Sequence, residues 1–431
     1  MGRKAKVEVS SENQENNGDL STLDDIIDQE FDKLVDISKF DTTVKTWYDV
    51  GIYSLNYICS KNLFGAVPSG RVTSFKGLSG TAKSMLMAQI AKDPKVDKII
   101  VINSEGGGLS AELFKFIGAP LDKVRMQGFN TFTNYRISKS SGKFEEVPDS
   151  EFPGKTETNE YIYVEGITRF VKRFVNAIEF RNIKSNIVIL IDSLANIRSV
   201  RELNGVSDFG SKIKEVNTFF GIFDNAFQKT NIALVFSNKL YNSMSGNMWE
   251  PFKESGGESV IYNPSLSVLL KETSLTEDKT DEEMKEEKER RKTALGSSLK
   301  AIKAIVDKSR FGTELRNITF LVDLNYGPVK LSGLFELCRD FGILERKGNS
   351  YTMPDVIDKP FFKKEFIPII ASDEVNYINK IQKKLEEAEE KIKQDKVKLQ
   401  VSDIEEIEEV ENEEKNEYEI GDLAKNMEAD L

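Results

Sequence analysis

A glycine-rich turn that directly follows a strand pattern is the segment that most restricts the fold of this chain. Residues 71–76 favour a β-strand, and the next eight residues read Gly-Leu-Ser-Gly-Thr-Ala-Lys-Ser, from Gly77 to Ser84. Small residues at this spacing let successive backbone N–H groups point inward, as in a loop that wraps phosphates ahead of a helix. The simpler alternative is a Gly/Ser turn that precedes a helix without binding anything.

The expected ligand of this loop is a nucleoside triphosphate with Mg²⁺. In that arrangement Lys83 reaches the β and γ phosphates and Ser84 binds the metal. Ala82 departs from the strict pattern because it places a methyl group where the second glycine is expected. The candidate phosphate-binding residues are Gly77, Ser79, Gly80, Thr81, Ala82, Lys83 and Ser84.

Two further apolar runs end in acidic residues. Residues 186–191 lead into Asp192, as expected of a buried parallel strand that delivers a carboxylate to the carboxyl edge of a sheet. Residues 98–103 lead into Glu105. We predict that Asp192 supports Mg²⁺ and that Glu105 polarises the attacking water. The alternative for both acids is an ordinary strand end that faces solvent.

Composition excludes several classes of site. The chain of 431 residues contains no histidine, which removes Ser/His/Asp and Cys/His catalysis and every metal site that includes histidine. Cys59 and Cys338 are far apart in sequence, so neither a zinc site nor a disulfide framework is expected, and a reducing, cytoplasmic compartment fits. No apolar stretch is long enough to span a membrane, and the polar start does not resemble a signal peptide.

Patterning divides the chain into five regions. We expect a disordered arm over 1–19, an N-terminal oligomerisation helix over 20–48, and an α/β core over 49–330 whose mostly parallel sheet is flanked by helices. Two polar or charged insertions interrupt the core near 138–160 and 274–298. A C-terminal helical region follows over 331–400, with a helix, a turn and a short hairpin in its first part. Further strands are expected at 232–236, 267–270, 301–306 and 318–323.

An acidic tail over 401–431 carries the whole charge imbalance. It contains 13 acidic residues and two lysines, which together equal the formal net charge of −11. Such a composition predicts disorder. The tail either keeps the protein in solution or competes with DNA for basic surface.

The motifs together resemble the RecA-type recombinases, most closely the T4-type bacteriophage branch of UvsX-like proteins. The resemblance runs from about residue 51 to 354. It rests on the order and spacing of short matches: Pro68-Ser69-Gly70, the 77–84 loop, Asn103-Ser104-Glu105, Ile191-Asp192-Ser193-Leu194, Ser237-Asn238, Gly256-Gly257, Lys308-Ser309-Arg310 and Gly348-Asn349-Ser350-Tyr351.

This resemblance implies a RecA-like P-loop ATPase core with ATP and Mg²⁺ as ligands. Glu105 then resembles the water-activating residue and Asp192 the acid beside the metal. Lys308 and Arg310 match paired cations that reach the ATP of the neighbouring subunit in a head-to-tail helical filament. A cation supplied in this way links hydrolysis to assembly, because it stabilises transition-state charge only when subunits stack.

The family contacts DNA through two loops, which fall here at about 198–210 and 239–257. Aromatic and cationic side chains in flexible loops suit unstacked single-stranded bases and phosphates, although the second loop could instead be a lid on the core. The candidate DNA-binding residues are Arg198, Arg201, Lys239, Trp249, Phe252 and Lys253. Two residues depart from the family pattern. Lys239 stands at the position that couples ATP to DNA, and Glu112 stands at the position that packs near the adenine.

The function implied is an ATP-dependent recombinase that forms filaments on single-stranded DNA and exchanges strands with double-stranded DNA in recombination, repair and recombination-dependent replication. Single-strand-binding and mediator proteins fit such a protein as further partners, and the cytoplasm, of a host cell if the chain is phage-encoded, as its location. Two other functions stay open: a RecA-fold DNA motor, such as a ring helicase or a partitioning ATPase, and an ATP-binding filament scaffold with little turnover.

Overall fold

The computed structural model describes residues 43–105, 107–126, 135–137, 140, 144–146, 163–203, 209–242, 252–254, 257–273 and 299–395. The predicted arm, the acidic tail, the insertion at 274–298 and residues 20–42 of the predicted helix lie outside these residues. The end of the predicted helix at 20–48 is wrong, because Trp47–Tyr48 form a short strand, β1, that pairs with β2 (Val67–Pro68). Of the insertion at 138–160, the strand β7 (Phe144–Glu146) is described, and it pairs with β6 (Tyr135–Ile137). Within the described residues, no helix has the length and apolar character needed to cross a membrane.

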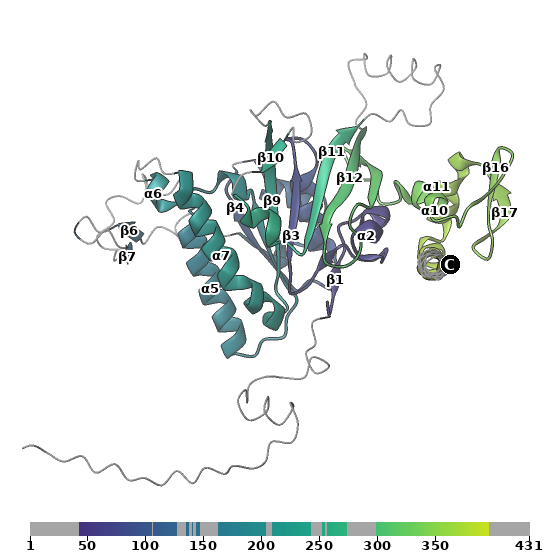
Figure 1. The fold of residues 1–431 in the computed structure, drawn as a ribbon. Helices are drawn as coiled ribbons and strands as arrows, with labels where there is room; N and C mark the ends of the chain where they lie inside the picture. Colours follow the sequence, from purple (N-terminus) through teal and green to yellow (C-terminus); the bar gives the residue numbers. More distant parts are fainter. Residues whose placement is uncertain are drawn as a thin grey trace, which may run out of the picture. The chain divides into compact units, whose positions relative to one another are not determined.

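A ten-stranded sheet forms the centre of the core (Figure 1). Its order is β14-β13-β12-β11-β3-β9-β8-β4-β5, and β10 pairs with β9 outside this path. Pairing is parallel from β11 to β5 and antiparallel elsewhere. The strands are β3 (Val72–Gly77), β4 (Lys98–Asn103), β5 (Val124–Met126), β8 (Ile187–Asp192), β9 (Ala233–Asn242), β10 (Phe252–Glu254), β11 (Leu266–Thr273), β12 (Leu299–Ser309), β13 (Asn317–Asp323) and β14 (Gly327–Pro328).

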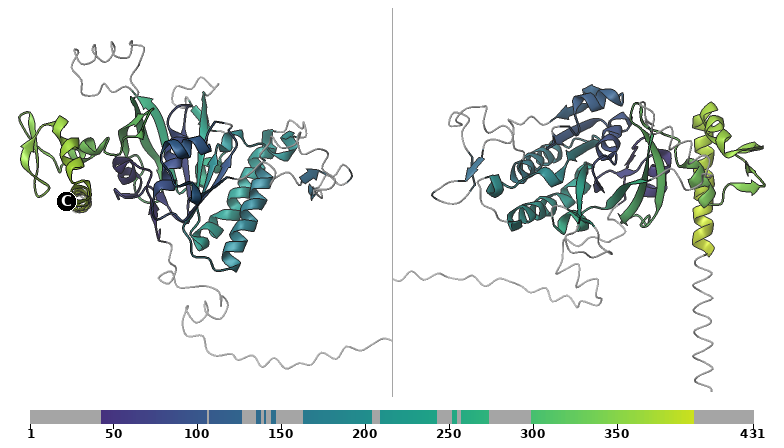
Figure 2. Two further views of the ribbon diagram at one scale, coloured as in Figure 1. Left: turned by 180° about the vertical axis from the view of Figure 1, so that it is seen from behind. Right: turned by 90° about the horizontal axis from the view of Figure 1, so that it is seen from above.

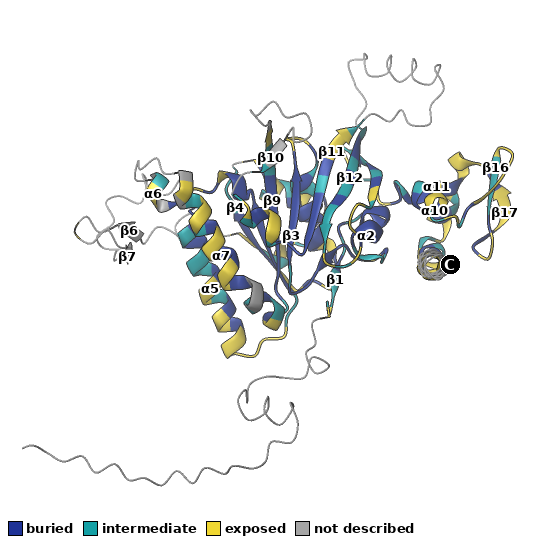
Figure 3. Cartoon of the chain, in the orientation of Figure 1, coloured by how far each residue is buried: buried dark blue, intermediate teal, exposed yellow. Residues whose placement is uncertain are grey.

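Helices cover both faces of this sheet. One face carries α5 (Val164–Phe180) and α7 (Phe209–Thr230), and the other carries α2 (Tyr53–Ser60), α3 (Lys83–Gln89) and α4 (Ala111–Phe116) (Figures 1 and 2). Burial explains the continuous apolar strands, because all six residues of β8 are buried. The outer sides of α5 and α7 are largely exposed (Figure 3). The predicted α/β class, with a mostly parallel sheet flanked by helices, is confirmed.

The helix α5 illustrates how sequence periodicity positions this layer. Its buried residues Val164, Ile167, Val171, Val175 and Ile178 recur at intervals of three or four. That spacing places them on one side of a helix, where they join the apolar cluster against the sheet.

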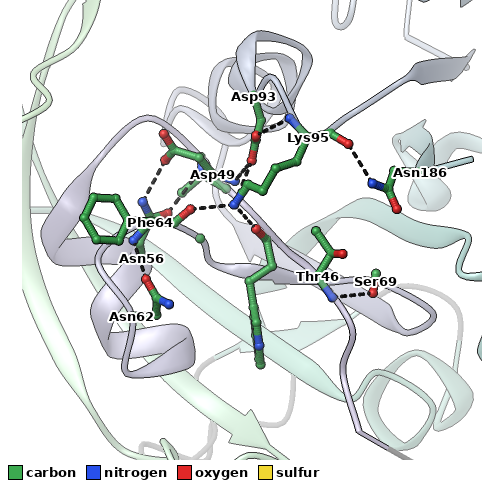
Figure 4. A network of polar contacts seen from close by, with 12 residues as sticks. Thr46, Asp49, Asn56, Asn62, Phe64, Ser69, Asp93, Lys95 and Asn186 are labelled. Atoms are coloured by element: carbon green, nitrogen blue, oxygen red, sulfur yellow. Dashed lines mark hydrogen bonds and ion pairs between the residues drawn. The ribbon is translucent and has the colours of Figure 1, made fainter. Parts of the chain in front are cut away.

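A polar network holds the starts of β4 and β8 side by side (Figure 4). The buried Asp93 carboxylate accepts a hydrogen bond from the Asp49 backbone N–H at 2.7 Å and pairs with Lys95 Nζ at 3.3 Å. Asn186 Nδ2 donates to the Lys95 carbonyl at 2.9 Å. With the strand starts joined in this way, Asn103 and Asp192 lie opposite each other at the far ends of β4 and β8.

The C-terminal region contains the predicted helix and hairpin, and a third strand extends the hairpin to a small sheet. The predicted first helix is α10 (Leu334–Asp340), and the predicted hairpin is β15 (Glu345–Lys347) with β16 (Ser350–Met353). A third strand, β17 (Ile357–Phe361), pairs with β16, and α11 (Lys363–Ser372) follows. Only the two end residues of β17, Ile357 and Phe361, are buried. The three residues between them are exposed and include two charged side chains, so the strand shows no apolar pattern in the sequence.

The last described helix, over residues 374–395, packs on the core. Its residues Ile378, Ile381 and Leu385 are fully buried and belong to the same apolar cluster as Tyr57 of α2. The Tyr57 hydroxyl donates to Glu389 Oε1 at 3.2 Å. The apolar stripe of this helix therefore faces the core of the same chain.

Candidate functional site

The loop between β3 and α3 has backbone angles that its small residues permit. Gly80 has a φ of 79° and Ala82 a φ of 66°, so both lie in the left-handed region that favours glycine. A Cβ at Gly77 would lie 2.3 Å from the Leu270 carbonyl oxygen on β11, so no larger residue fits there. Ala82 thus takes the conformation of the missing glycine in spite of its methyl group.

Lys83 begins α3 and turns back into this loop. Its Nζ donates to the carbonyl oxygens of Leu78 at 2.7 Å and Gly77 at 3.0 Å. Burial lowers the pKa of the Lys83 ammonium, although the carboxylates of Asp192 and Glu105 oppose this shift. A buried cation that contacts only neutral oxygens is poorly compensated, which suits it to bind an anion.

A cavity of about 340 Å³ opens beside the loop, and we call it the loop cavity. Its walls include the loop and helix residues 79–85 together with Glu105, Asp192, Lys239 and Lys300. One side is apolar and consists of Leu113, Ile302, Val322 and Leu324. Leu113, rather than the exposed Glu112, is the α4 residue that lines it. Three predicted groups, the loop, Asp192 and Glu105, are thus brought to one cavity.

Asp192 presents an uncompensated oxygen at the end of β8. The residue is 1% exposed, and its Oδ1 accepts a hydrogen bond from Ser237 Oγ. Its Oδ2 is buried and has no hydrogen-bond partner among the described residues. A Cβ on Gly108 would lie 2.5 Å from this oxygen, so glycine leaves the space in front of it open. A buried, unpartnered carboxylate oxygen suits a hard cation.

The residues present fit a Mg²⁺ ion that phosphates help to hold. Ser84 and Asp192 both line the loop cavity. Among the described residues, no three His, Cys, Asp or Glu side chains cluster closely enough to hold a metal by themselves. Mg²⁺ commonly keeps several waters and binds through one or two protein oxygens plus substrate phosphates, so this sparse donor set is sufficient.

Three side chains contact the Glu105 carboxylate, which lines the loop cavity. Its Oε1 accepts hydrogen bonds from Ser193 Oγ at 2.6 Å and Asn196 Nδ2 at 3.0 Å, and Lys239 Nζ lies 2.8 Å away. Burial alone would raise the pKa of the Glu105 carboxyl, but the bonds from Lys239 and Ser193 outweigh burial and lower it. The carboxylate is therefore ionised and anchored.

Two lysines in the loop cavity were not predicted to bind the nucleotide. Lys239, which the sequence assigns to DNA, lies within β9, opposite Gly77 of β3, and contacts Glu105 and, at 3.3 Å, Asn196 Oδ1. Lys300 of β12 lines the cavity near Gly80 and lies 3.4 Å from Glu272 Oε2. Lys300 gave no sequence signal, because it is one of many lysines in its region and only the sheet order brings it to the loop.

Lys308 and Arg310 lie at the opposite edge of the sheet from the loop. Lys308 pairs with Ser267 near the start of β11, whereas Gly77 pairs with Leu270 further along the same strand. Lys308 Nζ donates to the carbonyls of Ile261, at 3.0 Å, and Tyr262. Burial, followed by the charge of Arg310, lowers the pKa of Lys308. Neither cation lines the loop cavity of its own chain.

The predicted DNA-binding residues follow β8 and β9. Arg198 and Arg201 are exposed, and Arg201 lies in the short helix α6 (Val200–Leu203). Phe252 and Lys253 belong to β10, whose backbone pairs with β9, while Trp249 lies outside the described residues. The parallel strands β8 and β9 run in the same direction as β3, so their carboxyl ends and the loop after β3 lie on the same side of the sheet.

Sequence comparisons do not assign this arrangement to a family. No protein-family model matches the chain, and no curated protein matches its sequence. The site is therefore defined by its own geometry: a glycine-dependent loop, a buried lysine, an unpartnered aspartate oxygen and an anchored glutamate around one cavity.

Proposed function

We propose that this protein is an ATP-dependent DNA recombinase of the RecA type, which forms a filament on single-stranded DNA and promotes homologous pairing and strand exchange. One observation carries the proposal. The loop cavity gathers Lys83, Ser84, Asp192 and Glu105 from the ends of three parallel strands. A cation, two metal-binding oxygens and a carboxylate base in one cavity are the groups that hydrolysis of a nucleoside triphosphate requires.

Each group has a defined task in this proposal. Lys83 leaves the carbonyls of Gly77 and Leu78 to bind the terminal phosphates, which compensate its charge better. Ser84 and Asp192 hold Mg²⁺, which neutralises phosphate charge when bound. Glu105 orients the attacking water and accepts its proton. The apolar wall of the loop cavity accommodates the adenine of ATP, and Lys300 lies beside this wall.

The position of Lys308 supports action between subunits. Lys308 and Arg310 are at the sheet edge away from their own loop cavity, so they can approach a phosphate only in a neighbouring molecule. A repeated head-to-tail contact of this kind produces a helical filament unless the rotation closes a ring. The segments at 198–210 and 239–257 supply the DNA contacts, with phosphates and unstacked bases as the groups bound.

The direct test is ATP hydrolysis by the purified full-length protein with and without single-stranded DNA. We expect DNA to stimulate turnover at least tenfold, and Lys83→Ala to abolish it. Lys303→Ala, on β12 outside the loop cavity, is the matched control and should turn over ATP like wild type. DNA-independent or absent turnover in the wild type contradicts the proposal.

A filament scaffold with little turnover is the second candidate, and the ion pair between Lys239 and Glu105 favours it. A carboxylate engaged at 2.8 Å by an ammonium is a weaker base than a free one. Negative-stain images with ATP separate the candidates. Filaments without stimulated turnover indicate the scaffold, closed rings indicate a helicase or another DNA motor, and filaments with stimulated turnover indicate the recombinase.

A further inference from the structure

A buried lysine outside the loop cavity joins three elements of the sheet. Lys76 of β3 is 8% exposed and forms ion pairs with Glu254 of β10 and Asp307 of β12. In the sheet, β9 lies between β3 and β10, and β11 lies between β3 and β12. Figure 1 shows β3, β9 and β10 close together. We call Lys76, Glu254 and Asp307 the Lys76 triad.

Charge and burial make this triad a constraint on backbone position. Burial alone would lower the pKa of Lys76, but Asp307 and Glu254 outweigh burial and raise it, so the ammonium stays charged. The Glu254 side chain is 8% exposed, and its second oxygen accepts a hydrogen bond from Asn238 Nδ2 at 3.3 Å. Separating such a pair leaves an uncompensated charge in a poorly hydrated place, which is strongly unfavourable.

Each member of the Lys76 triad is next to a functional element. Lys76 immediately precedes Gly77, the first residue of the loop, and Asp307 immediately precedes Lys308. Glu254 lies in β10, within the predicted DNA segment 239–257, and pairs in register with Leu240 of β9. The Lys76 triad therefore connects three elements: the loop that begins at Gly77, the strand β10 of the predicted DNA segment, and the predicted intersubunit cation Lys308.

We propose that Lys76 is a positioning residue that couples nucleotide binding in the loop cavity to single-stranded DNA binding at the strands β9 and β10. This inference rests on the proposed function and concerns the same site. The ion pair with Glu254 fixes β10 to the strand that carries the loop. A displacement of β10 relative to β3 separates Glu254 from Lys76, so the position of β10 and the position of Gly77 are set together.

The test measures how much nucleotide tightens DNA binding. The dissociation constant of a fluorescent oligothymidine is determined by anisotropy, without nucleotide and with a slowly hydrolysed ATP analogue plus Mg²⁺. Their ratio is the coupling, and the affinity for the analogue alone is measured separately. Glu254→Gln is the principal variant, because it removes the charge that attracts β10 to Lys76 and leaves Lys76 paired with Asp307, which limits the effect on folding.

We expect a coupling of at least tenfold in wild type and below threefold in Glu254→Gln, with the affinity for the analogue unchanged within twofold. Lys76→Arg retains the charge and both carboxylate partners and should restore most of the coupling. Glu258→Gln is the matched control, since Glu258 is an exposed glutamate just beyond the DNA segment, and it should couple like wild type.

Two outcomes overturn the inference in distinguishable ways. If wild type shows the coupling and Glu254→Gln retains it, the triad is only structural, even where the melting temperature falls, and the recombinase proposal stands. If wild type binds DNA without regard to nucleotide, the proposed function and this inference fail together.

Discussion

Glu105 is held by an ion pair with Lys239, a contact that competes with its use as a base. Because a partly exposed ion pair of this kind contributes roughly 0.5–1 kcal/mol, we expect Lys239→Met to raise DNA-independent ATP turnover about two- to fivefold. Steady-state hydrolysis without DNA measures the effect. Lys239→Arg keeps the ion pair and should behave like wild type. A decrease in Lys239→Met turnover would assign Lys239 to the phosphates instead.

Burial of the Lys83 ammonium opposes folding. Because the folded protein lowers the pKa of this ammonium below its ordinary value of 10.5, the charged form is penalised in the native state. We expect Lys83→Met, measured without nucleotide, to melt a few degrees above wild type at neutral pH. The folded state binds fewer protons between the lowered pKa and 10.5, so wild-type stability rises with pH through that window.

The pH dependence provides the control for Lys83→Met. The difference between the two melting temperatures should shrink as pH approaches and passes 10.5. A difference that is constant with pH would attribute the gain to packing and not to charge.

At the scale of the element, the helix over residues 374–395 depends on the apolar side chains up to its middle turn. Leu385 is fully buried in the main apolar cluster, so Leu385→Ala should lower the free energy of unfolding by about 2–4 kcal/mol. Ile392 lies two turns further along and is 41% exposed. Ile392→Ala, the matched control, should change the free energy by less than about 0.5 kcal/mol. Denaturant unfolding measures both, and equal losses would contradict this packing.

How much of these elements the sequence predicts depends on the range of the interactions. The strands β4 and β8 follow from apolar runs within six residues, β3 follows from a short run of strand-favouring residues, and the loop after β3 follows from its own glycines. The ion pairs of Lys76 join residues 178 and 231 positions away, and no local pattern marks them. The partner of Glu105 escaped prediction for the same reason, since Lys239 meets it only because β8 lies between β4 and β9.

At the scale of the whole molecule, the proposed filament divides its catalytic groups between two subunits. Lys308→Glu places a negative charge where the proposal requires a cation, so DNA-stimulated turnover should fall at least a hundredfold while the circular dichroism spectrum is unchanged. Lys83→Ala should be equally inactive, because it lacks the phosphate-binding lysine in each loop cavity.

Mixing the two inactive variants tests the division directly. At a contact where Lys83→Ala contributes Lys308 and the other subunit contributes an intact loop cavity, both groups are present. An equimolar mixture should therefore recover a measurable fraction of stimulated turnover, about a quarter when subunits mix at random and each contact acts alone. Recovery of nothing would place Lys308 outside the neighbouring cavity.

The strand β12 reaches from Lys300 in the loop cavity to Lys308 at the far edge of the sheet. At about 3.3 Å per residue, the eight steps from Lys300 to Lys308 span about 26 Å. In the proposed filament the length of β12 therefore fixes the distance between the nucleotide bound by its own subunit, near Lys300, and the nucleotide of the neighbouring subunit, near Lys308. The rise per subunit is then set by the length of a β-strand, so a single-residue insertion in β12 changes the pitch of the polymer before it changes the chemistry.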